Sequence, residues 1–174
     1  MLWREVFILS LSIIAFDLQT PQLRTPGERP SDSLPQDLTE TETQTIRKER
    51  NPKPHVDAAL KVSDARITSA LKLVRESQYG TAAQDADIYA ALIVYSDSYT
   101  RKLPPSQIKD RNTCLKMIEQ AIFKQSHTVE AVIREFPVDY RQTAEAKLEQ
   151  VKRIRLRAIN DLLGDGRIIK TSEE

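Results

Sequence analysis

Hydrophobic residues between positions 55 and 163 recur at intervals of three, four and seven, which is the spacing of one face of an α-helix. The pattern is interrupted at residues 78–80, at Pro104 and Pro105, and at Pro137, and it ends at residues 164–166. Proline and glycine end helices at such places. The pattern therefore predicts four helices, each about 22–30 residues long.

The first predicted helix begins near Pro54 or His55 and ends at Gly80, where glycine can adopt the left-handed cap conformation. The second begins at Thr81, whose spacing from Gln84 predicts a capping box. Its apolar residues cover about half of the helix circumference, which is typical of a central helix. The expected core residues of these two helices are Val56, Leu60, Ile67, Leu71, Val74, Ala82, Ala86, Ile88, Tyr89, Leu92, Ile93 and Ser96.

The third predicted helix begins at Ser106 or Asn112 and ends at Phe136, and its apolar residues follow a seven-residue repeat. The fourth has Asp139 as its expected N-cap and ends at Gly164. The expected core residues of these helices are Ile108, Leu115, Ile118, Ile122, Val129, Val132, Leu148, Val151, Ile154, Ala158, Ile159, Leu162 and Leu163, with Gln125 as a polar exception.

Short loops between long helices favour antiparallel neighbours. We therefore expect an all-α fold, an antiparallel four-helix bundle of two hairpins over residues 55–165. Two stacked hairpins of an α-solenoid are the alternative. Tyr79, Ala82 and Ala86 have a spacing that resembles the helix-turn-helix of tetratricopeptide repeats over about one hairpin. Tyr89 stands where that family has a small residue, and no second copy follows, so the chain is not assigned to it.

The N-terminal segment carries an apolar run of eleven residues, Val6–Phe16, after Arg4. As a helix this run would rise only ~17 Å, against a hydrocarbon core of ~30 Å, so it is short for a membrane span. It matches the apolar region of a signal peptide, although no Ala-x-Ala cleavage site follows. We expect residues 1–18 to be a signal peptide or N-terminal anchor, with a buried N-terminal helix or strand as the alternative. The protein is then exported to the periplasm or outside the cell, with a membrane tether if the segment is not cleaved.

Residues 19–54 contain six of the nine prolines, mixed with Thr, Ser, Glu and Gln. Few apolar groups remain to offset the entropy of ordering the chain, which predicts a disordered linker. Residues 38–50 lack proline but have no apolar stripe, so only transient helix is expected there. Residues 166–174 are expected to form a flexible tail.

Charge and reactive side chains give little indication of chemistry. The net charge of +1 argues against a nucleic-acid partner. Cys114 is the single cysteine, so neither an intrachain disulfide nor a cysteine zinc site can form. His127 would lie ~20 Å along the same helix, too far to activate the Cys114 thiol. We expect no enzymatic activity, cofactor or metal.

Two pairs of residues are candidates for partner binding. Tyr95 and Tyr99 lie one helical turn apart at the margin of the second helix, where their rings could contact a partner. Arg153 and Arg157 belong to a basic run in the fourth helix. The alternatives are packing of the tyrosines within the fold, and pairing of the basic fourth helix with the acidic second helix, which carries Asp85, Asp87 and Asp97.

The function expected from these observations is a non-enzymatic interaction or structural module of the cell envelope, acting on an unknown protein or peptide partner as a monomer or weak homodimer. A tetratricopeptide-like peptide-binding adaptor is one alternative. A weak binder of anionic surfaces, membrane or nucleic acid, through the fourth helix is the other. Contact with a membrane is otherwise expected only through an uncleaved N-terminus.

Overall fold

The computed structural model describes residues 33–164, and this part of the chain is all helical, with no strand. The predicted all-α fold is thereby confirmed. The signal-like residues 1–18 and the predicted tail at 166–174 lie outside the described residues. The elements are α1 (Glu40–Arg47), α2 (Pro52–Arg75), α3 (Tyr79–Arg101), the 3-10 turn η1 (Pro105–Gln107), α4 (Ile108–Glu135) and α5 (Val138–Leu163).

Helix α1 lies inside the region that the sequence predicted as a linker. Thr39 and Glu42 form a reciprocal capping box that satisfies free backbone N–H groups at its first turn. Ile46, the single apolar residue of α1, is fully buried. It packs against α2 and α3 with four residues, Ala58, Ala59, Ile88 and Leu92. The cap, the buried Ile46 and the ion pair of Glu42 with Arg66 together order a helix that has no apolar stripe.

The turn between α2 and α3 differs from the prediction. Ser77, and not Gly80, takes the left-handed backbone conformation, with φ of 60°. Gly80 and Thr81 lie inside the first turn of α3, and the predicted Thr81 capping box does not form, because the helix begins at Tyr79 with Gln78 as its N-cap. Helix α2 begins at Pro52, where the fixed φ of proline suits the first helical position.

The ends of α4 and α5 also differ in detail. Ile108 starts α4 and is 49% exposed, so it does not continue the buried seven-residue repeat. Pro137 is the N-cap of α5, which places Asp139 in the first turn instead of at the cap. Leu162 and Leu163, expected in the core, are exposed in the last turn of α5.

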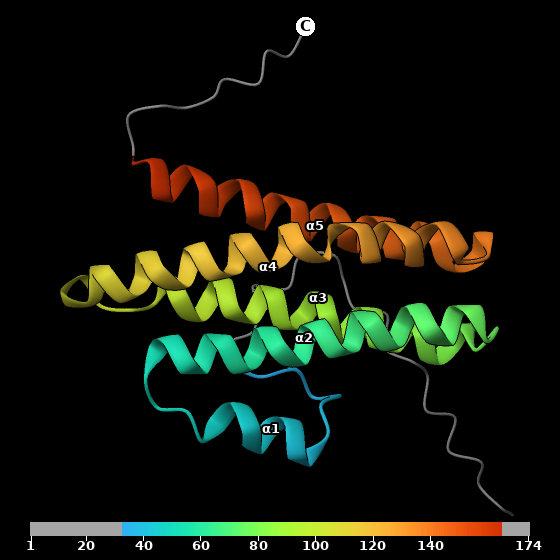
Figure 1. Cartoon of the computed structure of the whole chain (residues 1–174), viewed down its shortest axis with the longest axis horizontal. Helices are drawn as coiled ribbons and strands as arrows, with labels where there is room; N and C mark the ends of the chain where they lie inside the picture. Colours follow the sequence, from blue (N-terminus) through green and yellow to red (C-terminus); the bar gives the residue numbers. More distant parts are fainter. Residues whose placement is uncertain (1–32, 165–174) are drawn as a thin grey trace, which may run out of the picture.

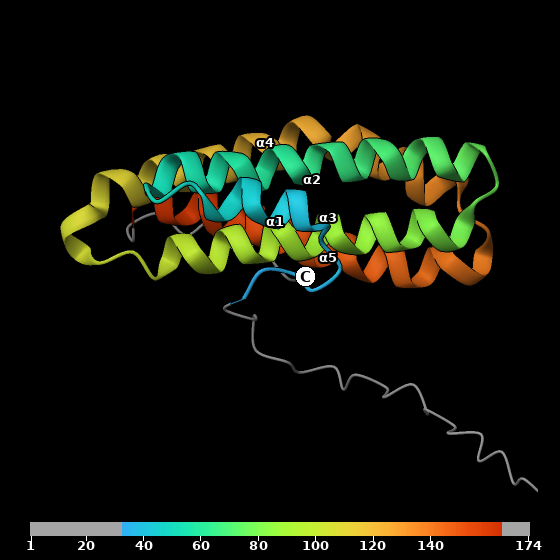
Figure 2. The same cartoon turned by 90° about the horizontal axis from the view of Figure 1, so that it is seen from below.

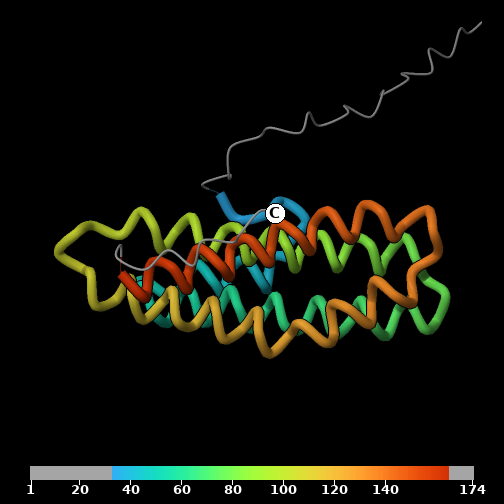
Figure 3. The backbone as a smooth tube through the Cα atoms, turned by 90° about the horizontal axis from the view of Figure 1, so that it is seen from above, coloured from blue at the N-terminus to red at the C-terminus, as the bar shows by residue number. Residues whose placement is uncertain are grey.

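The four long helices form two antiparallel hairpins, α2–α3 and α4–α5, joined by residues 102–107. Figure 3 shows how the hairpins stack, with α4 beside α2 and α5 beside α3. Helices that run in the same direction are therefore neighbours across the stack. In the expected up-down ring, α2 would also contact α5, but no such contact exists in the part of the chain that the structure describes.

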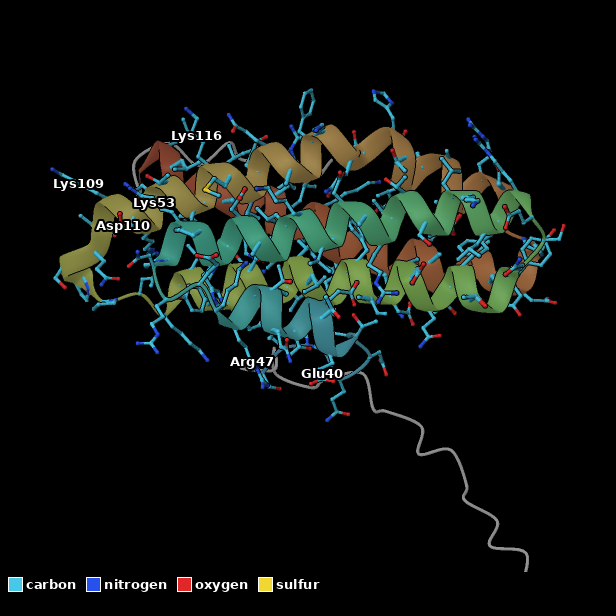
Figure 4. The ribbon with its side chains drawn as sticks, turned by 60° about the horizontal axis from the view of Figure 1, so that its bottom comes forward. Glu40, Arg47, Lys53, Lys109, Asp110 and Lys116 are labelled. Carbon is cyan, nitrogen blue, oxygen red and sulfur yellow. The ribbon has the colours of Figure 1, made fainter. Side chains whose placement is uncertain are left out.

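Charged pairs keep the two hairpins in register. Lys53 Nζ lies 3.0 Å from Asp110 Oδ1 and joins the start of α2 to the start of α4 (Figure 4). Arg75 Nε lies 3.2 Å from Glu135 Oε2 and joins the ends of the same helices. Helix α4 therefore lies beside α2 from its first turn to its last.

The hydrophobic core is divided into two clusters. The larger lies between the two hairpins and includes Ile67, Ile93, Ile118, Ile122 and Ile154. The smaller lies under α1, on the opposite side of the α2–α3 hairpin from α4 and α5 (Figures 1 and 2). The molecule thus has three layers, with α2–α3 in the middle.

Candidate functional site

Tyr95 and Tyr99 contact His55, which lies in the first turn of α2. His55 Nε2 lies 2.7 Å from the Tyr95 hydroxyl and its Nδ1 lies 2.9 Å from the backbone oxygen of Glu49. The Tyr99 ring stacks on the imidazole, with centroids 4.4 Å apart. Burial raises the pKa of both tyrosines. These side chains therefore attach the connection between α1 and α2 to α3, and both tyrosines are half-buried.

Arg153 and Arg157 lie on a different face, in a groove between α3 and α5. The groove has a volume of about 620 Å³. Its lining residues are Val94, Asp97, Ser98, Arg101, Lys102, Gln150, Arg153, Ile154, Leu156, Arg157 and Asn160. The structure brings the two arginines together but not with Tyr95 and Tyr99, which do not line this groove.

Asp97 organises the charges of the groove from its α3 side. It is only 4% exposed, and its two carboxylate oxygens accept hydrogen bonds from Arg101 Nε at 2.9 Å and Arg157 Nη2 at 3.1 Å. Arg101 also donates to Asp161 on α5 at 2.6 Å. Burial alone would lower the pKa of Arg101, but the hydrogen bonds and negative charges of Asp97 and Asp161 raise it overall. Arg101 is therefore held between α3 and α5 as a cation, and Arg157 joins Asp97 from the α5 side.

Arg153 differs from these paired arginines. It is exposed on α5 and makes no ion pair with the residues that the structure describes. Leu156 lies beside it on the same wall and is 60% exposed. The groove therefore combines an uncompensated cation with an uncovered aliphatic side chain.

The predicted pairing of the acidic and basic helices is confirmed at two positions. Asp87 of α3 pairs with Lys147 of α5, and Asp97 pairs with Arg157. Asp85 instead contacts Arg66 of α2. Much of the basic charge of α5 is thus used within the fold, and the surplus gathers at the groove.

The sequence interpretation missed the role of two residues. Asp97 was counted as part of an acidic surplus, but its four-residue spacing from Arg101 is the signal that would have marked an ion pair. Arg66 was not singled out, although its guanidinium joins three helices. It donates to Glu42 of α1 at 2.5 and 2.8 Å and to Asp85 of α3 at 2.6 Å.

Other reactive groups do not assemble into a site. Cys114 is fully buried on α4, and burial raises the pKa of its thiol. Within residues 33–164, no group of three or more His, Cys, Asp or Glu side chains is placed to hold a metal ion. None of the described helices is long and apolar enough to cross a membrane.

Comparison of the chain with protein-family models, with curated proteins and with solved structures gives no match. The groove between α3 and α5 is therefore interpreted from its own geometry and charge.

Proposed function

We propose that this protein is a non-enzymatic interaction module of the cell envelope, and that it binds a protein partner in the groove between α3 and α5. The proposal rests on two neighbouring side chains of the groove. Arg153 has no ion partner among the described residues, and Leu156 beside it is exposed. Arginine is enriched in protein interfaces, and Leu156 gives the groove an uncovered apolar contact beside Arg153.

The stacked order of the hairpins favours the adaptor among the functions expected from the sequence. The first helices of the two hairpins, α2 and α4, are neighbours, and so are the second helices, α3 and α5. The same order is found in α-solenoids, where binding surfaces form along equivalent helices of successive hairpins. In an up-down ring α3 would lie beside α4, and α5 beside α2, so a groove with walls from α3 and α5 would not form. We therefore propose a short solenoid-like adaptor.

Export of the protein is part of the same proposal and rests on the signal-like residues 1–18, which lie outside the described residues. Expressed with its own N-terminus in a Gram-negative host, the protein should leave the cytoplasm and be shortened near residues 15–20. An intact mass that retains Met1–Phe16 in the cytosolic fraction would contradict export.

The interaction itself is tested by placing a photoreactive amino acid at position 156 in living cells. We expect a discrete cross-linked adduct at this position, because the side chain of Leu156 points out of the fold at the groove. The control carries the same amino acid at Lys124, an exposed residue of α4 that does not line the groove. Equal adducts from both positions, or none from 156, would contradict the proposal.

Binding to an anionic surface through α5 remains the second candidate, because Arg153 and Arg157 would supply its charge. Salt-sensitive retention of the full chain on anionic vesicles would favour it. Equal recovery from anionic and neutral vesicles would remove it.

A further inference from the structure

The groove has the dimensions of a short peptide site. Its α5 wall runs from Gln150 to Asn160, which corresponds to about 15 Å along the helix axis. The α3 wall runs parallel to it from Val94 to Lys102. This length suits two to three turns of a partner helix or a few residues of an extended chain.

Hydrogen-bond donors follow one row of α5 along this wall. Gln150, Arg153, Arg157 and Asn160 are separated by three or four residues and so lie on one face of the helix. Leu156 stands between the two arginines and is 60% exposed. A partner that fits this row would present acceptors on both sides of an apolar contact.

Internal pairing leaves one cation of the groove without an ion partner among the described residues. Asp97 is shared by Arg101 and Arg157, whereas Arg153 makes no ion pair. Asp161, just beyond the groove, is engaged by Arg101. A carboxylate entering from a partner would therefore meet Arg153 and the exposed side of Arg157, whose side chain is 57% exposed.

The binding charges line a groove that α3 bounds on the other side, which favours a narrow segment over a flat or extended anion. A segment that enters the groove can reach Arg153, Arg157 and the Leu156 side chain together. A duplex needs many phosphate contacts, whereas here the net charge of the chain is +1. Carboxylates carried on a narrow segment match both the shape and the charge.

We infer that the groove between α3 and α5 binds an acidic segment of a partner protein in which an aliphatic side chain is flanked by carboxylates. The aliphatic side chain contacts Leu156 and Val94, and the carboxylates pair with Arg153 and Arg157. The inference rests on the proposed function and adds to it the chemical class of the partner.

The test uses the full chain and a fluorescein-labelled synthetic peptide that contains glutamates with leucines one helical turn apart. A matched peptide carries glutamine in place of each glutamate. Fluorescence anisotropy should show binding of the acidic peptide, weakened at least about tenfold by the glutamine replacement, because charge-assisted hydrogen bonds are lost. Equal binding of both peptides, or no binding of the acidic one, would overturn the inference.

Two variants of the protein locate the site. Arg153→Glu should weaken binding of the acidic peptide at least about tenfold, since it reverses a charge without breaking any internal ion pair. Lys124→Glu makes the same charge change on α4, away from the groove, and should leave affinity within about twofold. Circular dichroism checks that both variants fold. Equal weakening by the two variants would mean general electrostatic attraction and would overturn the inference.

Other occupants have distinct signatures in the same experiment. Retention on phosphatidylglycerol vesicles that Arg153→Glu abolishes would assign the groove to lipid. A dimer in analytical ultracentrifugation that Arg153→Glu dissociates would assign it to a second copy. Either result would overturn the assignment to an acidic partner. If instead the cross-link from position 156 persists in cells while the acidic peptide fails to bind, the proposed function stands and only the partner class is wrong.

Discussion

Ser77 holds the turn between α2 and α3 in a left-handed backbone conformation that glycine adopts without steric cost. We expect Ser77→Gly to raise the free energy of unfolding by about 0.5–1 kcal/mol, measured by urea denaturation. The gain is partial because glycine also increases the entropy of the unfolded chain. Gly80→Ala should also raise the free energy of unfolding, because Gly80 lies inside α3 and a methyl group there meets no atom within 4 Å. Loss of stability in Ser77→Gly would mean that other contacts fix the turn.

Asp97 is the residue whose removal should disturb the α3–α5 groove most. Asp97→Asn leaves Arg101 and Arg157 without their shared carboxylate in a partly buried position, and should lower the free energy of unfolding by about 1–3 kcal/mol. Glu149→Gln is the control, because it removes an exposed carboxylate of α5 and should cost under about 0.5 kcal/mol. Thermal or urea unfolding of both variants gives the comparison, and equal costs would contradict the structural role of Asp97.

At the scale of elements, attachment of α1 depends on the charge of Glu42. Burial would raise the pKa of Glu42, but hydrogen bonds from Arg66 and Thr39 outweigh it and lower the pKa. A carboxyl group whose pKa is lower in the folded state stabilises that state above its unfolded pKa. That contribution disappears as the pH falls through the lower, folded value. Attachment of α1 should therefore weaken below about pH 4.3, the ordinary glutamate pKa.

Hydrogen exchange at the Ile46 amide measures how firmly α1 is attached, and its protection should fall as the pH is lowered through the folded-state pKa of Glu42. Glu42→Gln is neutral at every pH, so in this variant α1 should be more weakly attached at neutral pH and should lose the acid dependence. An acid dependence that persists unchanged in Glu42→Gln would assign the titration to another group.

Helix α1 should also determine the smallest stable fragment. A fragment that begins at Pro52 uncovers the patch of Ala58, Ala59, Ile88 and Leu92 that Ile46 covers. We expect residues 52–164 to unfold at a lower temperature than residues 33–164 and to bind a hydrophobic dye. Ile46→Ala in the longer fragment should lower the free energy of unfolding by about 2–4 kcal/mol, as expected for a fully buried isoleucine. Equal melting of the two fragments would show that α1 adds nothing to the fold.

Helices α2 to α5 could be predicted because each repeats apolar residues over six or more turns, which leaves little ambiguity about type or position. Helix α1 could not, since Ile46 is its single apolar residue and its stability comes from tertiary contacts. The turn at Ser77 was missed because Gly80, directly before a threonine and a glutamine in capping-box spacing, is a stronger local signal.

The stacking of the hairpins and the groove could be predicted less well. The loop between α3 and α4 is short enough for a ring or a stack, and the choice depends on side-chain packing between distant segments. The basic residues Arg153 and Arg157 were visible in the sequence. The ion pair of Arg157 with Asp97, sixty residues away, was not, and neither was the separation of this groove from Tyr95 and Tyr99.

At the scale of the whole molecule, the two hairpins are related by a shift along the chain. Four ion pairs join residues sixty positions apart: Asp87–Lys147, Asp97–Arg157 and Arg101–Asp161 of α3 and α5, and Arg75–Glu135 of α2 and α4. At the start of α2 and α4 the pair Lys53–Asp110 has an offset of 57. The buried aliphatic residues of the two hairpins are not the same at the sixty-residue offset, so the sequence carries no visible repeat. What repeats is the alignment of each helix with the corresponding helix of the other hairpin, and not the sequence.

Because the second hairpin is placed on the first by a translation, a further hairpin could be added to the stack in the same way. Helices α4 and α5 pack on α2 and α3, and a further hairpin placed beyond α4 and α5 by the same translation would meet the same type of surface. Helix α1 terminates one side of the stack with a polar outer face, in the manner of a capping repeat. The other side ends in α4 and α5, where Phe123, Leu156 and Leu163 are at least 59% exposed. Growth of the stack, by design or by evolution, would therefore proceed from the α4–α5 side.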